Sequence, residues 1–337
     1  MLVGGFGTRL RPLTLSTPKQ MLPIVDRPML EWVVAQLVVH GIDDVVLALG
    51  YRPDAFRAAY PHGRCAGATL HYAVEPEPLD TAGAIRFAAK AAGIDERFVV
   101  VNGDVLTDLD ISALVAFHDE RAALATISLH RVEDPSRFGV VATDGDGRVT
   151  AFVEKPPPGA APSDLVNLGV YVFEASVLDR IPPARRVSIE REIFPLLAAE
   201  GSLYATDDKG AYFLDTGTPA QFLQAQLDLI GGCRPVSPRA VHRDARVAPG
   251  ATVVRSVVAT GAVVERDALV VGSAVLADAR VGAGASVRNT IVGPGAAVRP
   301  GATLEWTTFV RDGDATGPGS APGLAVPFPV GTYPLGP

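Results

Sequence analysis

Residues 28–51 read PMLEWVVAQLVVHGIDDVVLALGY, and this stretch decides the fold class. Apolar residues recur at helical spacing from Pro28 to His40, and Gly41 suits the position just past a helix end, where the chain turns left-handed. The run VVLALG after Asp44 then indicates a buried strand that ends in a glycine turn. A helix followed directly by a buried strand is typical of a largely parallel sheet covered by helices.

The same alternation continues to about Gly231 and places two acids just past strands. A helix predicted over 81–92 leads into the strand FVVVNG, and Asp104 follows it. Asp215 follows the strand in YFLDTGTP, directly before a helix for which Thr218 is the predicted N-cap. Ligands of open α/β sheets collect beyond the carboxyl ends of strands, so both acids are candidate functional residues.

After Gly232 the sequence acquires a repeat of about six residues, with small residues four positions after most of the apolar ones. Such a hexapeptide repeat predicts a triangular parallel β-helix with one strand on each side, because the coils stack only where the corners are small. The tail from Asp312 has no periodicity, and we expect it to be flexible. The repeating apolar positions are Val241, Val247, Val253, Val257, Val263, Leu269, Val275, Val281, Val287, Val292, Val298 and Leu304, and the small ones are Ala245, Ala251, Gly261, Ser273, Ala279, Ala285, Ala296 and Ala302.

Composition excludes several classes of function. The chain has 337 residues, 48% of them hydrophobic, and a net charge of −7. This acidity argues against a nucleic-acid partner or an anionic membrane surface. The sequence shows no apolar run of about 18 residues and no signal peptide, so we expect a cytoplasmic protein. Cys65 and Cys233 lack metal-ligand spacing, and we expect ordinary reduced thiols.

The amino-terminal run MLVGGFGTRLRPLT, residues 1–14, combines glycines with Arg9 and Arg11. Bare backbone followed by arginine suits an anion, because amide groups approach closely and guanidinium binds phosphate bidentately. A Walker A loop is excluded because the first lysine is Lys19, and the dinucleotide fingerprint because its third glycine position holds Leu10. Taken alone, the run is equally compatible with a surface turn. Together with Asp104 and Asp215 it indicates Mg²⁺ held by carboxylates and substrate phosphates.

The motifs that follow one another along the first domain resemble the sugar-1-phosphate nucleotidyltransferase family, and within it the guanylyltransferase branch that uses mannose-1-phosphate. The resemblance implies a Rossmann-like, mostly parallel sheet domain over 1–232 and a left-handed parallel β-helix over 233–311, followed by the tail 312–337. The motifs are GGFGTRLRPLT, TPKQMLPI, EPLDTAGAI, VNGDVLTDLD, FGVV, FVEKP, NLGVYVF, SIEREIFP and FLDTGTP.

The resemblance also implies a role for each matching residue. The reaction would be attack by a sugar-1-phosphate oxygen on the α-phosphorus of a nucleoside triphosphate, expected to be GTP, with pyrophosphate leaving. Arg9, Asp104 and Lys155 would be the catalytic residues. Gly4, Gly5, Thr8, Arg9, Lys19 and Thr81 would bind the nucleotide; Gly139, Glu154, Lys155 and Asn167 would bind the sugar phosphate; Asp104 and Asp215 would hold Mg²⁺.

Two features depart from the family pattern. Only three residues precede Gly4, whereas strands usually have about five or six, so we expect a shortened central strand and a natural start upstream of Met1. Asp80 stands where the family usually has glycine close to the nucleotide, which puts base recognition in question.

Alternative functions remain open at this point. Thymidylyl or uridylyl transfer to glucose-1-phosphate is one, and a non-catalytic regulatory subunit that binds a nucleotide-sugar is another. Acyl transfer in the β-helix would need a histidine base, for which His242 is the candidate. We expect the β-helix to serve self-association into a homo-oligomer instead, because an open-ended solenoid leaves edges that need cover.

Overall fold

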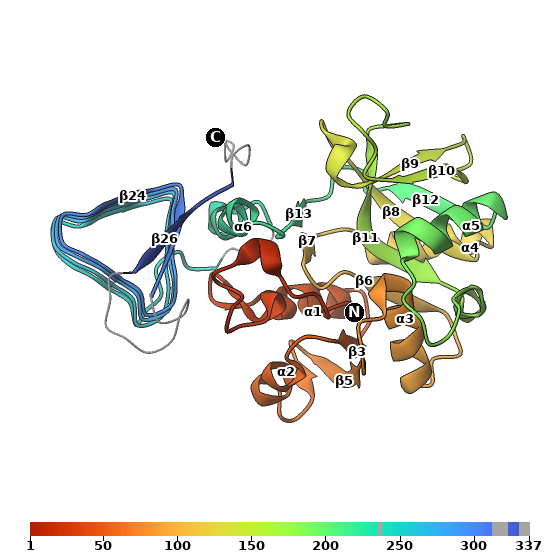
Figure 1. Ribbon diagram of the computed structural model, residues 1–337, viewed down its shortest axis with the longest axis horizontal. Helices are drawn as coiled ribbons and strands as arrows, with labels where there is room; N and C mark the ends of the chain where they lie inside the picture. The colour runs from red at the N-terminus through yellow and green to blue at the C-terminus, as the bar shows by residue number, and fades with distance from the viewer. Residues whose placement is uncertain (235–237, 312–322, 330–337) are drawn as a thin grey trace. The chain divides into compact units, whose positions relative to one another are not determined.

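The computed structural model describes residues 1–234, 238–311 and 323–329 (Figure 1). Contacts divide the chain into two compact units, of which the first comprises Met1–Gly5 and Leu30–Phe213. The second comprises Phe6–Met29 and the chain from Leu214 onward. The amino-terminal loop thus groups with the β-helix by contacts. The domain boundary predicted at residue 232 stays a prediction.

The first unit is built on a sheet whose strands nearly all run in one direction. β5 pairs with β3 in parallel, Leu2 bridges both Ala48 of β3 and Asn102 beyond β6, and β12 pairs with β8 in parallel. β11 runs against its neighbours β6 and β8, and the short strand β4 runs against β5. The prediction of a mostly parallel sheet is therefore confirmed. These strands are β3 (Asp44–Leu49), β4 (Arg64–Cys65), β5 (Ala68–Val74), β6 (Phe98–Val101), β8 (Ala125–Arg131), β11 (Leu165–Phe173) and β12 (Leu203–Asp207).

Further short elements complete this unit. A hairpin of β9 (Gly139–Thr143) and β10 (Val149–Glu154) joins the edge of the sheet beside β11. The core holds Tyr171, Phe173 and Phe194, whose rings lie 5.1–6.3 Å apart. The helices that begin in this unit or at its edge are α1 (Met29–Val39), α2 (Pro53–Ala59), α3 (Asp80–Ala91), α4 (Ile111–Arg121) and α5 (Phe194–Ala199), with the shorter turns η3 (Pro135–Arg137), η4 (Ala175–Arg180) and η5 (Ile189–Ile193) and the strands β7 (Val105–Thr107) and β13 (Phe213–Asp215).

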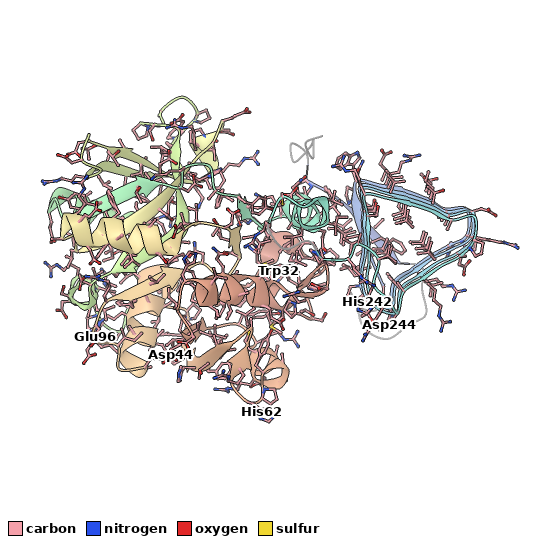
Figure 2. The ribbon with its side chains drawn as sticks, turned by 180° about the vertical axis from the view of Figure 1, so that it is seen from behind. Trp32, Asp44, His62, Glu96, His242 and Asp244 are labelled. Carbon is pink, nitrogen blue, oxygen red and sulfur yellow. The ribbon has the colours of Figure 1, made fainter. Side chains whose placement is uncertain are left out.

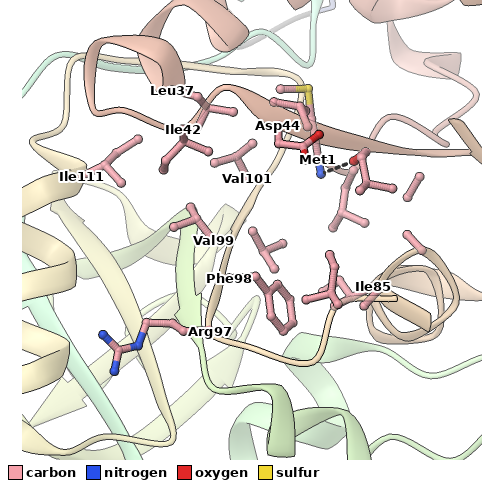
Figure 3. A pocket seen from close by; sticks show the side chains of 18 of the residues that line it. Met1, Leu37, Ile42, Asp44, Ile85, Arg97, Phe98, Val99, Val101 and Ile111 are labelled. Carbon is pink, nitrogen blue, oxygen red and sulfur yellow. Dashed lines mark hydrogen bonds between the residues drawn. The ribbon is translucent and has the colours of Figure 1, made fainter. Parts of the chain in front are cut away.

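The central position of the sheet, between β3 and β6, is only partly filled. Leu2 makes bridges there but no full strand, as the three residues ahead of Gly4 predict. Beside Met1 lies a cavity of about 520 Å³, whose walls include Leu37, Ile85 and Val99 (Figure 3). The Met1 amino group donates a hydrogen bond to the Val46 carbonyl at 2.8 Å, and burial lowers its pKa to about 5. The sheet therefore has an apolar gap at its centre.

In the second unit, the amino-terminal segment packs on helix α6 (Pro219–Gly231). The Gln226 side chain accepts from the Val25 amide at 2.6 Å and donates to the Pro23 carbonyl at 2.8 Å. Thr218 caps α6, as predicted, by accepting from the Gln221 amide. Two short pieces of this segment, η1 (Thr8–Leu10) and η2 (Lys19–Met21), precede a small hairpin of β1 (Pro23–Ile24) and β2 (Arg27–Pro28).

The hexapeptide repeats form a parallel β-helix, seen end-on as a triangle in Figure 1. Residues 17 apart in sequence pair across neighbouring coils, as Thr252 does with Leu269 and Leu269 with Ser286. The fold prediction is confirmed for the parallel coils, and their left-handedness stays a prediction. The strands are β14 (Arg246–Val247), β15 (Thr252–Val254), β16 (Val257–Val258), β17 (Val263–Val264), β18 (Leu269–Val271), β19 (Ala274–Val275), β20 (Arg280–Val281), β21 (Ser286–Arg288), β22 (Ile291–Val292), β23 (Ala297–Val298), β24 (Thr303–Glu305) and β25 (Thr307–Val310).

The structure corrects the predicted repeat by one residue in one coil. Val258, Val264 and Val270 are fully buried in the β-helix core, whereas the predicted positions were Val257, Val263 and Leu269. Ala262 likewise takes the small position predicted for Gly261. The reason is that one side of each coil is a residue shorter than the other two. Each shorter side contains a buried Ser or Thr whose hydroxyl donates to the carbonyl two residues earlier in the chain. These residues are Ser256, Ser273 and Thr290.

Part of the predicted flexible tail is regular. β26 (Leu324–Pro327) pairs antiparallel with β25, and the Phe328 ring lies 6.4 Å from that of Trp306. The strand escaped prediction because it is short and follows a Gly/Pro-rich stretch, while its pairing partner lies in the last coil. The remainder of that tail, 312–322 and 330–337, lies outside the described residues.

Candidate active site

The amino-terminal loop in the second unit folds back on itself. Gly7 has a φ of 61°, and the Thr14 hydroxyl donates to its carbonyl at 2.7 Å. A Cβ at Gly7 would lie 3.0 Å from the Thr14 methyl and 3.3 Å from Lys19 Cβ, so both the conformation and the space favour glycine. Thr8 and Arg9, which follow, are exposed. The loop thus presents these two predicted nucleotide-binding residues to solvent.

Two cations and a carboxylate converge in this unit. Lys19 is buried, and its Nζ lies 3.8 Å from Asp215 Oδ1. A Cβ at Gly217 would lie 2.8 Å from Arg9 Nη2 and 3.1 Å from Asp215 Oδ1, so the guanidinium and the carboxylate flank this glycine. A buried lysine is costly unless paired, which makes the Lys19–Asp215 pair part of the fold. Three predicted site residues are therefore brought together.

In the first unit, glycines let backbone segments approach at the strand ends. A Cβ at Gly4 would lie 3.2 Å from the Gly50 amide nitrogen, whereas Gly5 has open space around it. A Cβ at Gly103 would lie 2.6 Å from Val3 Cγ1. Asp104, the residue after this close approach, is partly exposed just past β6. Its position beyond a strand end is as predicted.

The pair Glu154–Lys155 ends β10 opposite Gly139 of β9. Lys155 Nζ lies 2.7 Å from Glu154 Oε1, and its side chain is 59% exposed. The Lys155 amide donates to the Phe138 carbonyl at 2.9 Å, which ties the end of β10 to the start of β9. A Cβ at Gly139 would lie 2.6 Å from the Phe152 ring and 3.0 Å from Glu154 Oε2. A larger residue at position 139 would collide with Phe152 and Glu154, so the packing requires glycine there.

Asn167 lies at an irregularity of β11, where its register with β8 shifts. Its amide nitrogen donates to the Tyr171 hydroxyl at 2.9 Å, and its side-chain oxygen accepts from the Gly169 amide at 2.9 Å. A Cβ at Gly169 would lie 2.6 Å from the Asn102 side chain. The bulge therefore packs Asn102, Asn167 and the buried Tyr171 into one polar cluster.

Sequence reasoning gave no role to Glu190, which the structure places beside Thr81. The Thr81 hydroxyl donates to Glu190 Oε2 at 2.8 Å and accepts from the Ile189 amide at 2.8 Å. Burial raises the pKa of the Glu190 carboxyl. The available signal was the motif SIEREIFP, which contains this acid.

Asp80, the departure from the family pattern, begins α3 with a φ of 61°. Its Oδ1 accepts from the Thr81 amide at 2.8 Å, and the residue is exposed. Aspartate tolerates this left-handed conformation better than most residues because its short side chain bonds the nearby backbone. In this structure the Asp80 carboxylate is folded back on its own helix.

The predicted site residues are divided between the two units. The described residues contain no cluster of three or more His, Cys, Asp or Glu side chains arranged for a metal ion. Mg²⁺ in phosphate-transfer sites often takes only one or two carboxylates, with phosphates and water completing its shell, and the carboxylate oxygens of Asp104 and of Asp215 are each ligands of the kind it prefers. Gly4, Gly5, Thr81, Asp104, Gly139, Glu154, Lys155 and Asn167 belong to the first unit, and Thr8, Arg9, Lys19 and Asp215 to the second.

The remaining candidate residues, His242 and the two cysteines, show local contacts that indicate no reactive role. His242, in the first coil of the β-helix (Figure 2), accepts from the Asp244 amide through Nδ1 at 3.2 Å, as in a local turn. Cys65 and Cys233 are both thiols outside any disulfide, and burial raises the pKa of the Cys65 thiol to about 11. None of the described helices combines the length and apolar composition needed to cross a membrane.

A mostly parallel sheet with polar residues and glycines at its strand ends, continued by a hexapeptide β-helix, defines the class of protein. The profile of the Nucleotidyl transferase family matches residues 1–231, and that of the GlmU-like, C-terminal hexapeptide family matches residues 219–307. The chain belongs to the Nucleotidyl transferase family, whose members typically depend on Mg²⁺. The resemblance stated from the sequence is therefore confirmed.

Within this family the chain is similar to curated mannose-1-phosphate guanylyltransferases. It is 43% identical over 266 residues to the Mycobacterium tuberculosis protein, covering 75% of this chain and 72% of that one. It is 40% identical to the catalytic subunit beta of Dictyostelium discoideum, covering 66% and 62%, and 38% identical to beta-B of Xenopus laevis, covering 75% and 69%. The matches thus span roughly two thirds of these relatives.

Two solved structures are also similar. A putative glucose-1-phosphate thymidylyltransferase from Bacillus anthracis superposes with a TM-score of 0.60 at 26% identity, covering 67% of this chain and 92% of that one. HddC from Yersinia pseudotuberculosis, in complex with GMP-PN, gives a TM-score of 0.57 at 29% identity, covering 67% and 96%. Each superposition covers nearly all of the other protein and about two thirds of this chain. The similarity therefore supports the same fold for the larger part of this chain.

Proposed function

We propose that the chain transfers a guanylyl group from GTP to mannose-1-phosphate, giving GDP-mannose and pyrophosphate. The observation that carries this proposal is the set of matched residues at the strand ends, in a chain 38–43% identical to proteins named for that activity. Every residue to which the resemblance gives a role is present, including Lys155 and both acids.

On the nucleotide side, the exposed loop of Gly4, Gly5 and Thr8 would wrap the triphosphate through close backbone approach. Arg9 is exposed and free to bind phosphate oxygens bidentately. Lys19 is buried beside Asp215, so its positive charge is held in one position and its side chain is not mobile in solvent. The side chain therefore loses little conformational entropy when an anion arrives.

On the sugar side, Lys155 would hold the phosphate of the incoming sugar-1-phosphate. Its exposed side chain rests on Glu154 in this structure, an ion pair that a phosphate would compete with. Glu154 and Asn167 offer carboxylate and amide oxygens to sugar hydroxyls, and Gly139 leaves the backbone bare beside them. This set suits an anionic, polyhydroxylated ligand.

Asp104 and Asp215 would hold Mg²⁺, which supplies charge neutralisation at the α-phosphate when bound. The nucleophile is already an anion at neutral pH, so no side chain has to remove a proton from it. What the protein must do is bring two mutually repelling anions together in line. Arg9, Lys19 and Lys155 do this by orientation and by their positive charge.

The test is pyrophosphate release by the purified chain with Mg²⁺, for each common nucleoside triphosphate against mannose-1-phosphate and glucose-1-phosphate. Selective release with GTP and mannose-1-phosphate is the expected result. Release with dTTP or UTP and glucose-1-phosphate would replace it with the alternative transferase. Nucleotide-sugar binding without release in any pair would instead show the regulatory subunit. Asp104→Asn, expected to lose release by orders of magnitude, is the negative control.

We also propose that the chain self-associates through its β-helix and works in the cytoplasm. The edge strands β14 and β15 carry Val247 and Val254, which are 39% and 46% exposed. Exposed apolar strand edges gain by being covered, and cysteine thiols outside any disulfide suit a reducing compartment. Light scattering after gel filtration measures the first proposal, and a monomer at micromolar concentration would contradict it.

A further inference from the structure

Glu190 lies in a hydrogen-bonded cluster that the proposed mechanism does not use. Its Oε2 accepts from two hydroxyls, Thr81 Oγ1 at 2.8 Å and Ser188 Oγ at 2.9 Å. The Thr81 hydroxyl also accepts from the Ile189 amide. The carboxyl group thus joins the start of α3 to a segment more than a hundred residues later in the chain.

The backbone adds to the same junction. The amides of Ala82 and Gly83 donate to the Val187 carbonyl at 2.9 and 3.2 Å, and the Val187 amide donates to the Leu79 carbonyl at 3.0 Å. A Cβ at Gly83 would lie 3.1 Å from the Arg185 carbonyl. Because the first amides of a helix have no partner within it, these bonds determine where α3 begins.

As a result, the polar groups of Thr81 already have partners inside the protein. Its amide bonds Asp80 and its hydroxyl bonds Glu190 and Ile189. Glu75 lies just ahead of this helix start, accepts from the Leu79 amide at 3.0 Å, and lies 3.6 Å from where a Cβ of Gly4 would be. The start of α3 is therefore tied on one side to Glu190 and on the other to the neighbourhood of the glycine loop.

Glu190 also neighbours the sugar-side residues. Burial and the charges of Glu190 and Glu154 raise the pKa of Tyr171, which places both carboxyl groups near its phenol. Tyr171 in turn bonds Asn167. One partly buried acid thus contacts the helix start on the nucleotide side and lies near the Glu154 and Asn167 cluster.

We propose that Glu190 is a positioning residue: it fixes the start of α3 through Thr81 and thereby sets the affinity of the site for the nucleoside triphosphate. This inference rests on the proposed function. It assigns Thr81 an indirect role, in which its hydroxyl holds the helix in place while the backbone around it meets the ligand. Glu190 acts in this role as a hydrogen-bond acceptor, and its negative charge is not required.

The decisive variants are Glu190→Ala and Glu190→Gln. The alanine removes the carboxylate that accepts from the Thr81 and Ser188 hydroxyls, so the KM for GTP should rise at least tenfold with a smaller change in kcat. The glutamine keeps an acceptor oxygen and should stay within about threefold of the parent chain. Glu192→Ala, on the same segment but bonded to Ser188 and Arg185, is the matched control and should leave the KM unchanged.

A double-mutant cycle separates positioning from general damage. Thr81→Ala should raise the KM as Glu190→Ala does, and the double variant should be no worse than the worse single one, because both break one interaction. Additive effects, an unchanged KM in Glu190→Ala, or a fall in melting temperature alone would overturn the proposal.

Amide hydrogen exchange measures the stability of the same junction and does not require an active enzyme. Amides of residues 81–84 should exchange at least tenfold faster in Glu190→Ala and at the parent rate in Glu190→Gln. If the parent chain proves inactive with every substrate pair, the proposed function fails, while this exchange result still decides whether Glu190 positions α3. Equal exchange in all variants would refute the positioning role even in an active enzyme.

Discussion

The molecule contains two parallel β regions that are assembled in opposite ways. In the β-helix each strand meets a neighbour 17 residues away, and valines such as Val264, Val281 and Val298 stack in register through the coils. In the α/β sheet the strands come from distant parts of the chain, and the centre is held by the short segment of Met1, Leu2 and Val3, beside a cavity of about 520 Å³. The non-repeating sheet has a gap at its centre, and Asp104 and Lys155, two of the predicted site residues, follow its strand ends.

The largest expected effect sharpens this difference, because it should alter rate without altering stability. Lys155→Ala should lower kcat/KM by about a thousandfold, roughly 4 kcal/mol, since it removes a positive charge from the reacting phosphates. The melting temperature should stay within about 1 °C, because the Lys155 side chain is 59% exposed and its ion pair is with the adjacent Glu154. Pyrophosphate release and thermal melting measure the two quantities. Near-normal turnover would remove Lys155 from the site.

A substitution in the β-helix should do the reverse. Val270→Ala removes two methyl groups from a fully buried core position and should cost about 2–3 kcal/mol of unfolding free energy. Val254→Ala in the first coil is the matched control, because Val254 is 46% exposed, and it should cost less than about 0.5 kcal/mol. Denaturant titration of both variants checks the pair. Equal losses would show that the coils are not packed as described.

Burial of the Met1 amine makes the stability of the sheet depend on pH. The Met1 amine has a pKa of about 5 when folded against 8.0 for the free group, so the unfolded chain binds more protons between these values. Unfolding free energy should therefore rise with pH from about 5 to 8, by about 2 kcal/mol between pH 5.5 and 7.5. The N-acetylated chain has no such amine and is the control. If both chains show the same pH dependence, the amine is not the cause.

The smallest effect concerns the corner hydroxyls of the β-helix. Ser273 accepts from the Thr290 amide at 3.1 Å and donates to the Val271 carbonyl at 2.8 Å. Ser273→Ala would leave that buried amide unpaired and should cost about 1–2 kcal/mol. Ser273→Thr should cost far less, since threonine already stands at the same corner one coil on, at Thr290. Chemical denaturation distinguishes them, and a harmless alanine would show the hydroxyls to be incidental.

Local signals predicted most of the fold and the placement of the acids. Helical spacing, the glycine after His40 and the N-cap Thr218 all depend on neighbours in sequence, and Asp104 lies just past its strand as expected. The six-residue repeat gave the β-helix, yet misplaced Val257 by one because one side of each coil is a residue shorter than a strict six-residue spacing allows.

What escaped prediction depends on contacts between distant segments. The bond from Val25 to Gln226 joins residues 201 positions apart, and no periodicity reveals it. The same holds for Glu190 and Thr81, which are 109 positions apart. The motif around Glu190 was recognisable, but its partner was not, so sequence alone gave it no role.

The 17-residue register of the β-helix has a further consequence. Because successive coils pair strand on strand at a fixed spacing of 17 residues, a whole coil could be removed or duplicated without disturbing the alignment of the others. The length of this region can therefore change in steps of one coil, which is 17 residues. The α/β sheet permits no such step, since each of its strands has a unique place.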